Sequence, residues 1–176
     1  MAVRLPVTTT MGHVSRALSF FELDNIYFAL GKTSPWDGEL EENFSVPLPS
    51  VSATTLDELI GMKRVDVKSL VYPDEEGTVV YRDKTWRKIS AEEAVKLGAH
   101  WVYIESSILY EDFPETAYRQ IGVFSRVVAN EDVPVTQTVL LPENIKDTGI
   151  LEILDQRKVV TRHEDSRDRF SMIIEF

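Results

Sequence analysis

The feature that most constrains the fold is the stretch of residues 25–49, where a short apolar run is followed by a long irregular segment. Residues 26–30 read IYFAL, an apolar and partly aromatic run that predicts a strand ending at Gly31. Loops of this length without secondary structure are uncommon in compact domains, and they are usually functional or disordered. The loop contains the aromatic residues Trp36 and Phe44, followed by Pro47 and Pro49. We expect the aromatic side chains to hold the loop against a surface.

Trp36 lies in a proline-flanked loop just after a strand end, and this position leaves two locations open for its ring. A tryptophan brings a large contact area at a small entropic cost, so it is favoured at protein interfaces. A tryptophan beside a strand end also often folds back onto its own core. Insertion into a neighbouring subunit predicts that Trp36→Ala damages assembly only, whereas packing on its own sheet predicts a loss of folding stability.

The chain has 176 residues, of which 43% are hydrophobic and 10% aromatic, so it suits a globular domain and not a disordered chain. We expect a single domain over residues 1–176, with an extended arm at residues 1–9 that is flexible or bound to a partner. The absence of cysteine excludes a disulfide scaffold, a thiol nucleophile and a Cys-ligated metal site.

The formal net charge of −10 and the isoelectric point of about 4.8 describe a strongly acidic protein. Such a surface repels phosphate backbones and anionic membranes, so we expect neither nucleic acid nor a membrane as partner. No apolar run approaches the roughly 20 residues that a membrane-spanning helix needs. The first residues also lack the apolar core of a signal peptide, so we expect a soluble protein without an export signal.

The rest of the chain predicts an α+β fold that is mainly antiparallel sheet, with a few short helices and the long Pro/Trp-containing loop. Apolar residues at helical spacing predict a helix at residues 9–23. The last two strands are expected to form a hairpin around the charged turn HEDSRD. The predicted strands that follow the loop cover residues 63–72, 78–82, 100–108, 118–128, 135–141, 150–162 and 169–176.

Capping residues predict two further helices. Ser90 and Glu93 have the spacing of a capping box, which predicts a short helix directly after Ser90. Thr54 or Thr55 can cap another short helix with the sequence LDELIG. Residues 73–77, PDEEG, predict a turn in which proline fixes one dihedral angle and glycine accepts a positive one.

Several short patterns resemble sites but are explained better as structure. Residues 31–33, GKT, look like the end of a phosphate-binding loop, but Ile26 stands where the first glycine is required and Pro35 follows at once. Residues 163–165, HED, could offer metal ligands, although such a cluster in a terminal turn is more often a solvated bend. We therefore expect no cofactor and no metal site.

Several further segments occur in a particular order along the chain, from about residue 13 to the C-terminus. These are GKTSPW (31–36), the Pro-x-Pro of Pro47 and Pro49, a short helix and KR strand (60–65), a tyrosine-turn-strand with a tryptophan (72–86), YRQIG (118–122), the TG-x-LE-x-L segment (148–162) and IIEF (173–176). In this order they resemble the wedge proteins of bacteriophage tail baseplates, in particular the small dimeric wedge component of contractile tails. The chain is much shorter than the best-known members and resembles a minimal version without their inserted domains.

The resemblance implies a structural component of a baseplate wedge that joins neighbouring subunits and has no catalytic residues. The implied partners are other wedge proteins and hub or tube proteins, with the chain itself in a homodimer or a multi-copy ring. The implied location is the virion tail baseplate, assembled in the host cytoplasm. The candidate interface residues are Trp36, Phe44, Pro47, Pro49, Tyr118, Arg119 and Gln120.

Two alternative functions remain open. A tail-tip or carbohydrate-binding β module would show exposed, coplanar aromatic side chains in a groove. A small glycoside hydrolase would use Glu105 or Glu111 together with Asp112, because that chemistry needs two carboxylates flanking a cleft. With 29 acidic residues, chance proximity of two carboxylates is expected, and no serine-nucleophile motif is present.

Overall fold

The computed structural model describes residues 6–113, 115, 117–165 and 167–176. The chain divides into two compact units, each assembled from segments that are distant in sequence. The first unit comprises Met1–Leu23, Asp66–Glu105 and Ser171–Phe176, and the second comprises Asp24–Val65 and Ser106–Phe170. A single domain over residues 1–176 stays a prediction. Of the predicted N-terminal arm, residues 1–5 lie outside the described residues.

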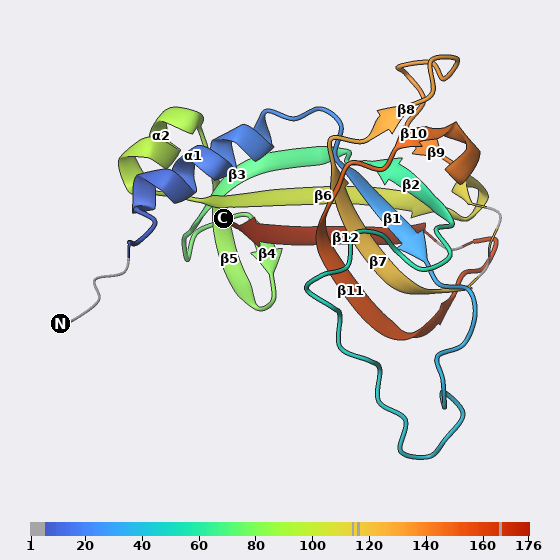
Figure 1. Ribbon diagram of the computed structural model, residues 1–176. Coiled ribbons are helices and arrows are strands. Elements are labelled where there is room, and N and C mark those ends of the chain that lie inside the picture. The colour runs from blue at the N-terminus through green and yellow to red at the C-terminus, as the bar shows by residue number, and fades with distance from the viewer. Residues whose placement is uncertain (1–5, 114, 116, 166) are drawn as a thin grey trace. The chain divides into compact units, whose positions relative to one another are not determined.

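The described residues form mostly antiparallel strands with two short helices, as expected for the predicted α+β class (Figure 1). The helices are α1 (Thr10–Phe21) and α2 (Ala91–Leu97), and neither is long enough to cross a membrane. The strands are β1 (Tyr27–Gly31), β2 (Gly61–Arg64), β3 (Val67–Pro73), β4 (Val79–Tyr81), β5 (Lys84–Ile89), β6 (Trp101–Leu109), β7 (Ala117–Ser125), β8 (Val128–Ala129), β9 (Val139–Leu140), β10 (Ile145–Asp147), β11 (Ile150–Thr161) and β12 (Arg167–Glu175).

The second unit is built on a sheet with the strand order β11-β7-β1-β2-β9. The central strand is β1, where Ala29 stands opposite Gly122 of β7 and opposite Met62 of β2. Every residue of β1 is buried, as the apolar run IYFAL predicts. The core of this unit includes Tyr27, Ala29, Leu56, Met62, Phe124, Val127 and Leu140.

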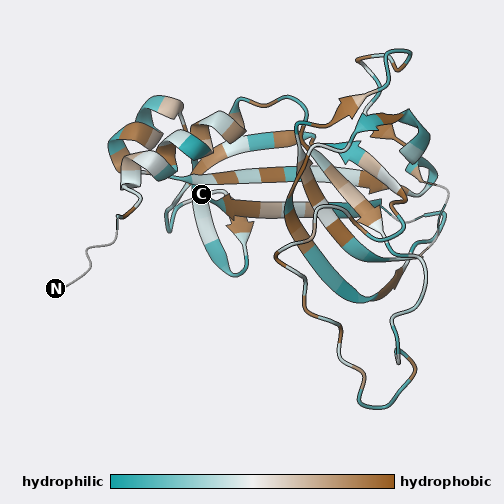
Figure 2. Ribbon diagram, viewed as in Figure 1, coloured by the Kyte–Doolittle hydropathy of each residue, from teal (hydrophilic) through white to brown (hydrophobic). Residues whose placement is uncertain are grey.

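The other large sheet has the order β12-β6-β3-β5-β4, and in the first unit α1 and α2 contact β3. Hydrophobic residues recur along β6 and β12 (Figure 2). In this unit the ring of Phe176 lies 5.0 Å from that of Phe20, and the partly buried Trp101 packs against an apolar cluster. That cluster consists of Val71, Val79, Trp86 and Tyr103.

The capping box of α2 is confirmed. The Ser90 hydroxyl accepts the Glu93 N–H at 3.2 Å, and a Glu93 carboxylate oxygen accepts the Ser90 N–H at 3.0 Å. The helix ends at Gly98, whose φ of 67° is left-handed. A signal that depends on residues three apart in sequence is thus read correctly without knowledge of the fold.

The role predicted for the glycine of the PDEEG turn is wrong. Gly77 does not have a positive φ. Instead, a Cβ atom at this position would lie 2.2 Å from the backbone carbon of Trp86. Close approach of the turn to β5 therefore requires the glycine, and the backbone angle does not.

The predicted short helix LDELIG is also wrong. Glu58 has a φ of 48°, which a right-handed helix cannot accommodate. The backbone groups of this segment pair with the end of β1 instead: Ile60 N–H donates to the Leu30 carbonyl at 2.9 Å, and Lys32 N–H donates to the Asp57 carbonyl at 2.6 Å. These long-range bonds replace the local ones that a helix would have made.

The predicted terminal hairpin is wrong as well. The strands β11 and β12 both exist, but β11 neighbours β7 in one sheet and β12 neighbours β6 in the other. In the first unit Ile173 packs on the apolar cluster and Phe176 meets Phe20. Apolar side chains occur at both odd and even positions of β12, so they lie on both faces of the strand. The alternation of polar and apolar residues therefore could not identify its partner strand.

Two predicted strands are shorter than expected. The run 63–72 is interrupted between β2 and β3, because Val65 N–H donates to the Ile26 carbonyl while Asp66 N–H donates to the Glu105 carbonyl. The run 135–141 is reduced to β9, which pairs with β2. The start of that run forms a turn instead, in which Gln137 N–H donates to the Pro134 carbonyl at 2.9 Å.

Candidate functional site

Residues 32–60, here called the loop, connect β1 to β2 and extend away from the sheet (Figure 1). The two ends of the loop lie together because β1 and β2 are antiparallel neighbours, with Leu30 opposite Gly61. Gly31 allows this closeness, since a Cβ atom there would lie 2.8 Å from the Asp57 carbonyl oxygen. The loop therefore leaves and re-enters the sheet at one point.

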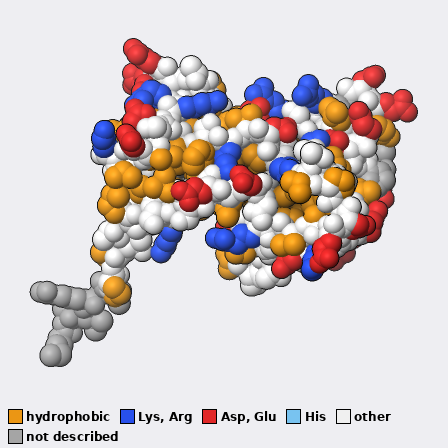
Figure 3. All heavy atoms as spheres, turned by 90° about the horizontal axis from the view of Figure 1, so that it is seen from above, with side chains coloured by type: hydrophobic (Ala, Val, Ile, Leu, Met, Phe, Trp, Pro, Cys, Tyr) orange, Lys and Arg blue, Asp and Glu red, His pale blue; other side chains and the backbone are white. Residues whose placement is uncertain are grey.

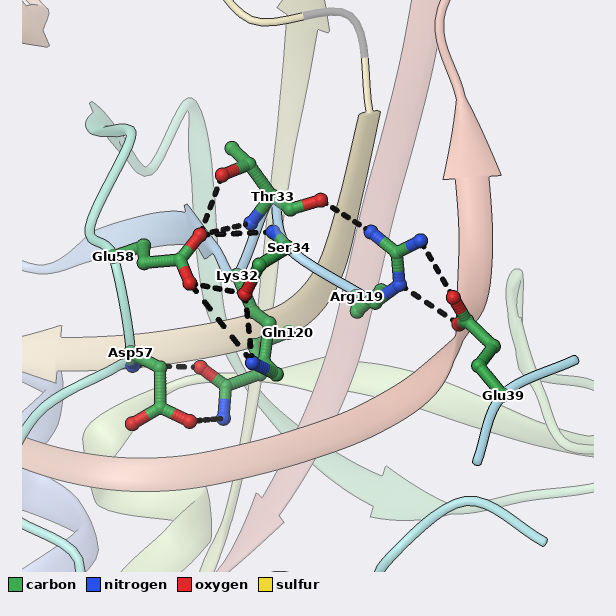
Figure 4. A network of polar contacts seen from close by, with 8 residues as sticks. All are labelled: Lys32, Thr33, Ser34, Glu39, Asp57, Glu58, Arg119 and Gln120. Carbon is green, nitrogen blue, oxygen red and sulfur yellow. Dashed lines mark hydrogen bonds and ion pairs between the residues drawn. The ribbon is translucent and has the colours of Figure 1, made fainter. Parts of the chain in front are cut away.

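Eight residues, here called the neck, hold the two arms of the loop together. The outgoing arm follows β1, and the returning arm precedes β2. They are Lys32, Thr33, Ser34, Glu39, Asp57, Glu58, Arg119 and Gln120, and Figure 4 shows their polar contacts.

Glu58 of the returning arm binds the outgoing arm through four donors. Its carboxylate accepts the N–H groups of Thr33 and Ser34, both at 2.9 Å, the Thr33 hydroxyl at 2.5 Å and the Ser34 hydroxyl. Lys32 lies beside them, with Nζ 3.9 Å from a Glu58 oxygen. The hydroxyl and backbone donors of Ser34 and Thr33 lower the pKa of Glu58 from 4.5 to about 2. The carboxylate is therefore ionised at neutral pH and works as a cap for this turn.

Lys32 and Glu58, where the two arms of the loop meet, both have left-handed backbone conformations: φ is 58° at Lys32 and 48° at Glu58. Neither is glycine, and such conformations are sparsely populated by residues with a Cβ atom. The hydrogen bonds of the neck hold these two angles in place. Backbone strain at both arms is typical of a segment whose geometry is constrained for function.

Strand β7 supplies the other half of the neck. Arg119 donates to both carboxylate oxygens of Glu39, at 2.8 and 2.7 Å, and to the Thr33 carbonyl at 2.5 Å. The two charged side chains are only 7% and 12% exposed, and the hydrogen bond from Arg119 lowers the pKa of Glu39. A bidentate ion pair that is shielded from solvent is among the stronger polar contacts in proteins.

Gln120, the next residue of β7, binds the returning arm. Its amide oxygen accepts the Asp57 N–H at 2.8 Å, and its amide nitrogen donates to the Asp57 carboxylate at 3.3 Å. Successive strand residues point to opposite faces, so Arg119 and Gln120 reach the two arms from opposite sides of β7. One strand therefore fixes the position of both arms.

Trp36 is buried on its own chain, with 8% of its surface exposed. Its indole N–H donates to the Arg157 carbonyl of β11 at 2.9 Å, and the Lys32 ammonium lies 4.9 Å from the ring centroid. The structure therefore supports the second of the two locations considered for this ring. Trp36 extends the attachment of the outgoing arm beyond the neck.

Beyond Trp36 the loop exposes aliphatic side chains. We call residues 40–51 the tip. Leu40, Leu48 and Val51 are 100%, 91% and 107% exposed, and the tip is ordered by local turns such as Phe44 N–H donating to the Glu41 carbonyl at 3.1 Å. A groove of about 210 Å³ separates the end of the tip from β11; it is lined by Pro49, Ser50, Val51, Ala53, Leu151, Glu152 and Leu154. An ordered loop with three fully exposed aliphatic residues is a candidate contact surface.

The candidate interface residues named from the sequence fall into two groups. Pro47 and Pro49 are exposed in the tip, and Phe44 is half-buried there. The others, Trp36, Tyr118, Arg119 and Gln120, are buried inside the chain, and hydrogen bonds of Trp36, Arg119 and Gln120 hold the loop.

Tyr118 supports the sheet beneath the neck. Its ring packs edge-on against Phe170 at 6.2 Å, and burial raises the pKa of Tyr118 to about 12. The phenol is therefore neutral in any physiological solution.

Sequence reasoning missed Leu40, Val51, Glu39 and Glu58. Leu40 stands in GELEE and Val51 in SVS, and a lone aliphatic residue among acids or serines of a loop is a signal that could have found both. No local signal identifies Glu58 as a neck residue, because its partners Thr33 and Ser34 lie 25 and 24 residues away in sequence.

The carboxylates considered for a hydrolase have structural partners. Asp112 accepts the Leu109 N–H at 2.8 Å and pairs with Lys63 at 3.1 Å, while Glu105 accepts the Tyr103 hydroxyl. In the part of the chain that the structure describes, no three His, Asp or Glu side chains gather as a metal site. Among those residues, too, the large hydrophobic side chains that are exposed are all aliphatic.

Comparison with known proteins identifies the family of the chain. Residues 5–176 match the family model described as "Baseplate wedge 3 tail fiber network component". The chain is also 32% identical over 148 residues to "Virion protein 3" of Enterococcus phage phiEF24C, a match that covers 81% of this chain and 78% of the relative. The predicted resemblance to phage baseplate wedge proteins is thereby confirmed. The chain belongs to the family of baseplate wedge 3 tail fiber network components, and it is a structural protein of the phage baseplate in the virion tail.

Proposed function

We propose that this protein joins neighbouring subunits of the baseplate wedge, and that the tip of the loop makes the contact. The observation that carries the proposal is the combination of a fixed neck with the fully exposed side chains of Leu40, Leu48 and Val51. Exposed aliphatic residues on a held loop lose little further conformational entropy when they bind. Such a loop is suited to act as an anchor in a neighbouring protein.

We further propose that the protein acts without catalysis, in several copies, beside hub or tube proteins, and that it is assembled in the host cytoplasm. Support comes from the family, whose members are structural components of the baseplate. Repeated copies in a closed particle contact each other through symmetric patches, so a homodimer or a ring fits this proposal. The candidate residues Pro47, Pro49 and Phe44 would lie at the edge of the tip contact.

No observation favours the two alternative functions. A carbohydrate-binding module needs exposed aromatic platforms, and the described residues place Trp36 and Trp86 in the interior. A glycoside hydrolase needs two carboxylates free to act on a sugar, whereas Asp112 caps a turn and pairs with Lys63.

The test replaces Leu40, Leu48 and Val51 together by serine in the full chain. Because these side chains are exposed, each change should alter stability by less than about 0.5 kcal/mol. A phage lacking its own copy of the gene is then complemented with the variant, and complete tails are counted by electron microscopy. We expect unchanged melting and a large loss of complete baseplates.

The matched control replaces Val80 and Val135, which are 68% and 85% exposed but lie outside the loop, by serine. We expect this control to assemble normally. Equal numbers of complete baseplates for the tip variant and the control would contradict the proposal.

A further inference from the structure

After Lys32, all charged residues of the loop are acidic. Between residues 33 and 62 the sequence contains no Lys and no Arg, but it contains six acidic residues. On the face shown in Figure 3, by contrast, basic and acidic side chains are interspersed. The six acids of the loop are Asp37, Glu39, Glu41, Glu42, Asp57 and Glu58.

Half of these acids are satisfied by the neck. Glu39 is bound by Arg119, Asp57 by Gln120 and Glu58 by the turn at Thr33 and Ser34. The other half, Asp37, Glu41 and Glu42, are exposed, and within the described residues their carboxylates have no hydrogen bond and no ion pair. Negative charge that the chain does not neutralise is thus concentrated at the tip and just before it.

These free carboxylates lie next to the exposed aliphatic residues. Leu40 is directly followed by Glu41 and Glu42, and Asp37 is three residues before it. Interfaces commonly consist of an apolar centre with a polar, solvent-accessible rim. The tip has this composition, with one sign of charge only.

We propose that the tip docks into an apolar pocket rimmed by Lys and Arg on a different baseplate protein. This inference rests on the proposed function and adds the chemistry of the partner. Leucine and valine side chains fill the pocket, and the carboxylates of Asp37, Glu41 and Glu42 meet the basic rim. Complementary charges steer the encounter and exclude partners with an acidic surface.

A second copy of this chain is an unsuitable binding partner for the tip. Each copy has a net charge of −10, and two tips would bring like charges together. The free acids at the tip therefore select against self-association through this surface and in favour of a basic partner.

The first experiment identifies the partner inside the assembled particle. A photoreactive amino acid is placed at Leu48 in the full chain, and the same residue is placed at Val80 as a control. After irradiation of purified virions, cross-linked peptides are identified by mass spectrometry. We expect Leu48 to cross-link to a different virion protein at a segment that contains Lys or Arg beside apolar residues.

The second experiment measures the role of charge with the cross-linked protein, purified, as the probe. Glu41→Lys with Glu42→Lys should weaken its binding by about tenfold or more, because repulsion replaces attraction at the rim. The control, Glu75→Lys with Glu76→Lys, makes the same change in net charge at an exposed turn of the first unit and should leave binding unchanged. Raising the salt concentration should weaken wild-type binding and should strengthen binding of the tip variant, because screening relieves its repulsion from the basic rim.

The outcomes separate the two proposals. A cross-link to a segment without basic residues, or equal binding by the two charge variants, overturns the basic partner but leaves the tip as an anchor. A cross-link from Leu48 to another copy of this chain also overturns it. If Leu48 cross-links to no protein in virions that contain the chain, both this inference and the proposed function are wrong.

Discussion

At the scale of single residues, Glu58 does the most to define the loop. One carboxylate receives donors from two consecutive residues of the other arm, and its own backbone is left-handed. Glu39 and Asp57 have comparable positions opposite Arg119 and Gln120. None of these pairings could be predicted from the sequence, because each joins residues that are 24 to 80 positions apart. The buried state of Arg119 was likewise hidden, since an arginine in a strand is usually exposed.

Replacement of Glu58 by glutamine should loosen the neck. Both N–H groups and the Thr33 hydroxyl donate to one oxygen of Glu58, Oε2, and the Ser34 hydroxyl donates to Oε1. The neutral amide keeps one acceptor oxygen but removes the negative charge that strengthens these bonds. We expect a loss of about 1 kcal/mol in the free energy of unfolding and faster hydrogen exchange of both amides. Glu75→Gln, an exposed carboxylate, is the control; equal exchange in the two variants would show that Glu58 does not hold the turn.

Acid should act on the neck through the same carboxylate. The folded-state pKa of Glu58 is lowered to about 2 from 4.5, so the protein binds this proton more weakly when folded than when unfolded. The stability that Glu58 contributes is therefore fully present above about pH 4.5 and is lost as the pH falls toward about 2. The difference in melting temperature between wild type and Glu58→Gln should shrink over this range, and a constant difference would contradict the assignment.

At the scale of elements, the sequence predicts what local signals determine. The capping box at Ser90 and Glu93 and the apolar run of β1 are read correctly because their causes lie within a few residues. The helix predicted at LDELIG fails because backbone groups at Asp57 and Ile60 pair with the distant strand β1. The terminal hairpin fails for a similar reason: alternation shows that β12 is a strand but not which strand it joins.

Trp36 attaches the outgoing arm of the loop to β11, and its removal should therefore destabilise the fold. Trp36→Ala is expected to lower the free energy of unfolding by roughly 3–5 kcal/mol, seen as a clear fall in the thermal melting temperature. Trp36→Phe keeps most of the packing and loses only the bond to the Arg157 carbonyl, so its effect should be smaller. An unchanged melting temperature for the alanine variant would mean that the ring is free in the isolated chain.

The turn before β4 depends on the missing side chain of Gly77. A Cβ atom there would lie 2.2 Å from a backbone atom of Trp86, so Gly77→Ala should cost about 1–3 kcal/mol or more. Gly12→Ala is the matched control, because Gly12 lies in α1 and its nearest neighbour would be the Thr8 methyl at 3.2 Å. Thr8 is exposed and its methyl group can move, so this change should cost far less than Gly77→Ala, and chemical denaturation of both variants measures the difference.

At the scale of the whole molecule, the protein presents one long loop whose base is fixed and whose tip is apolar and acidic. The order of short segments along the chain was enough to indicate the baseplate family, although it did not show which residues are exposed. Trp36 and Arg119, which are interface candidates in the sequence, are buried in this chain, whereas Leu40 and Val51, which the sequence did not indicate, are fully exposed. Which loop residues are exposed depends on where the chain leaves the sheet. Residues that are close together in the sequence do not determine this.

The most direct test of the central claim is an electron cryo-microscopy map of the tail baseplate that resolves this chain. We predict that Leu40, Leu48 and Val51 will be buried against another baseplate protein, with the neck unchanged from the free chain. A map in which the tip remains in solvent, while other surfaces of the chain make all the contacts with neighbouring subunits, would contradict the account.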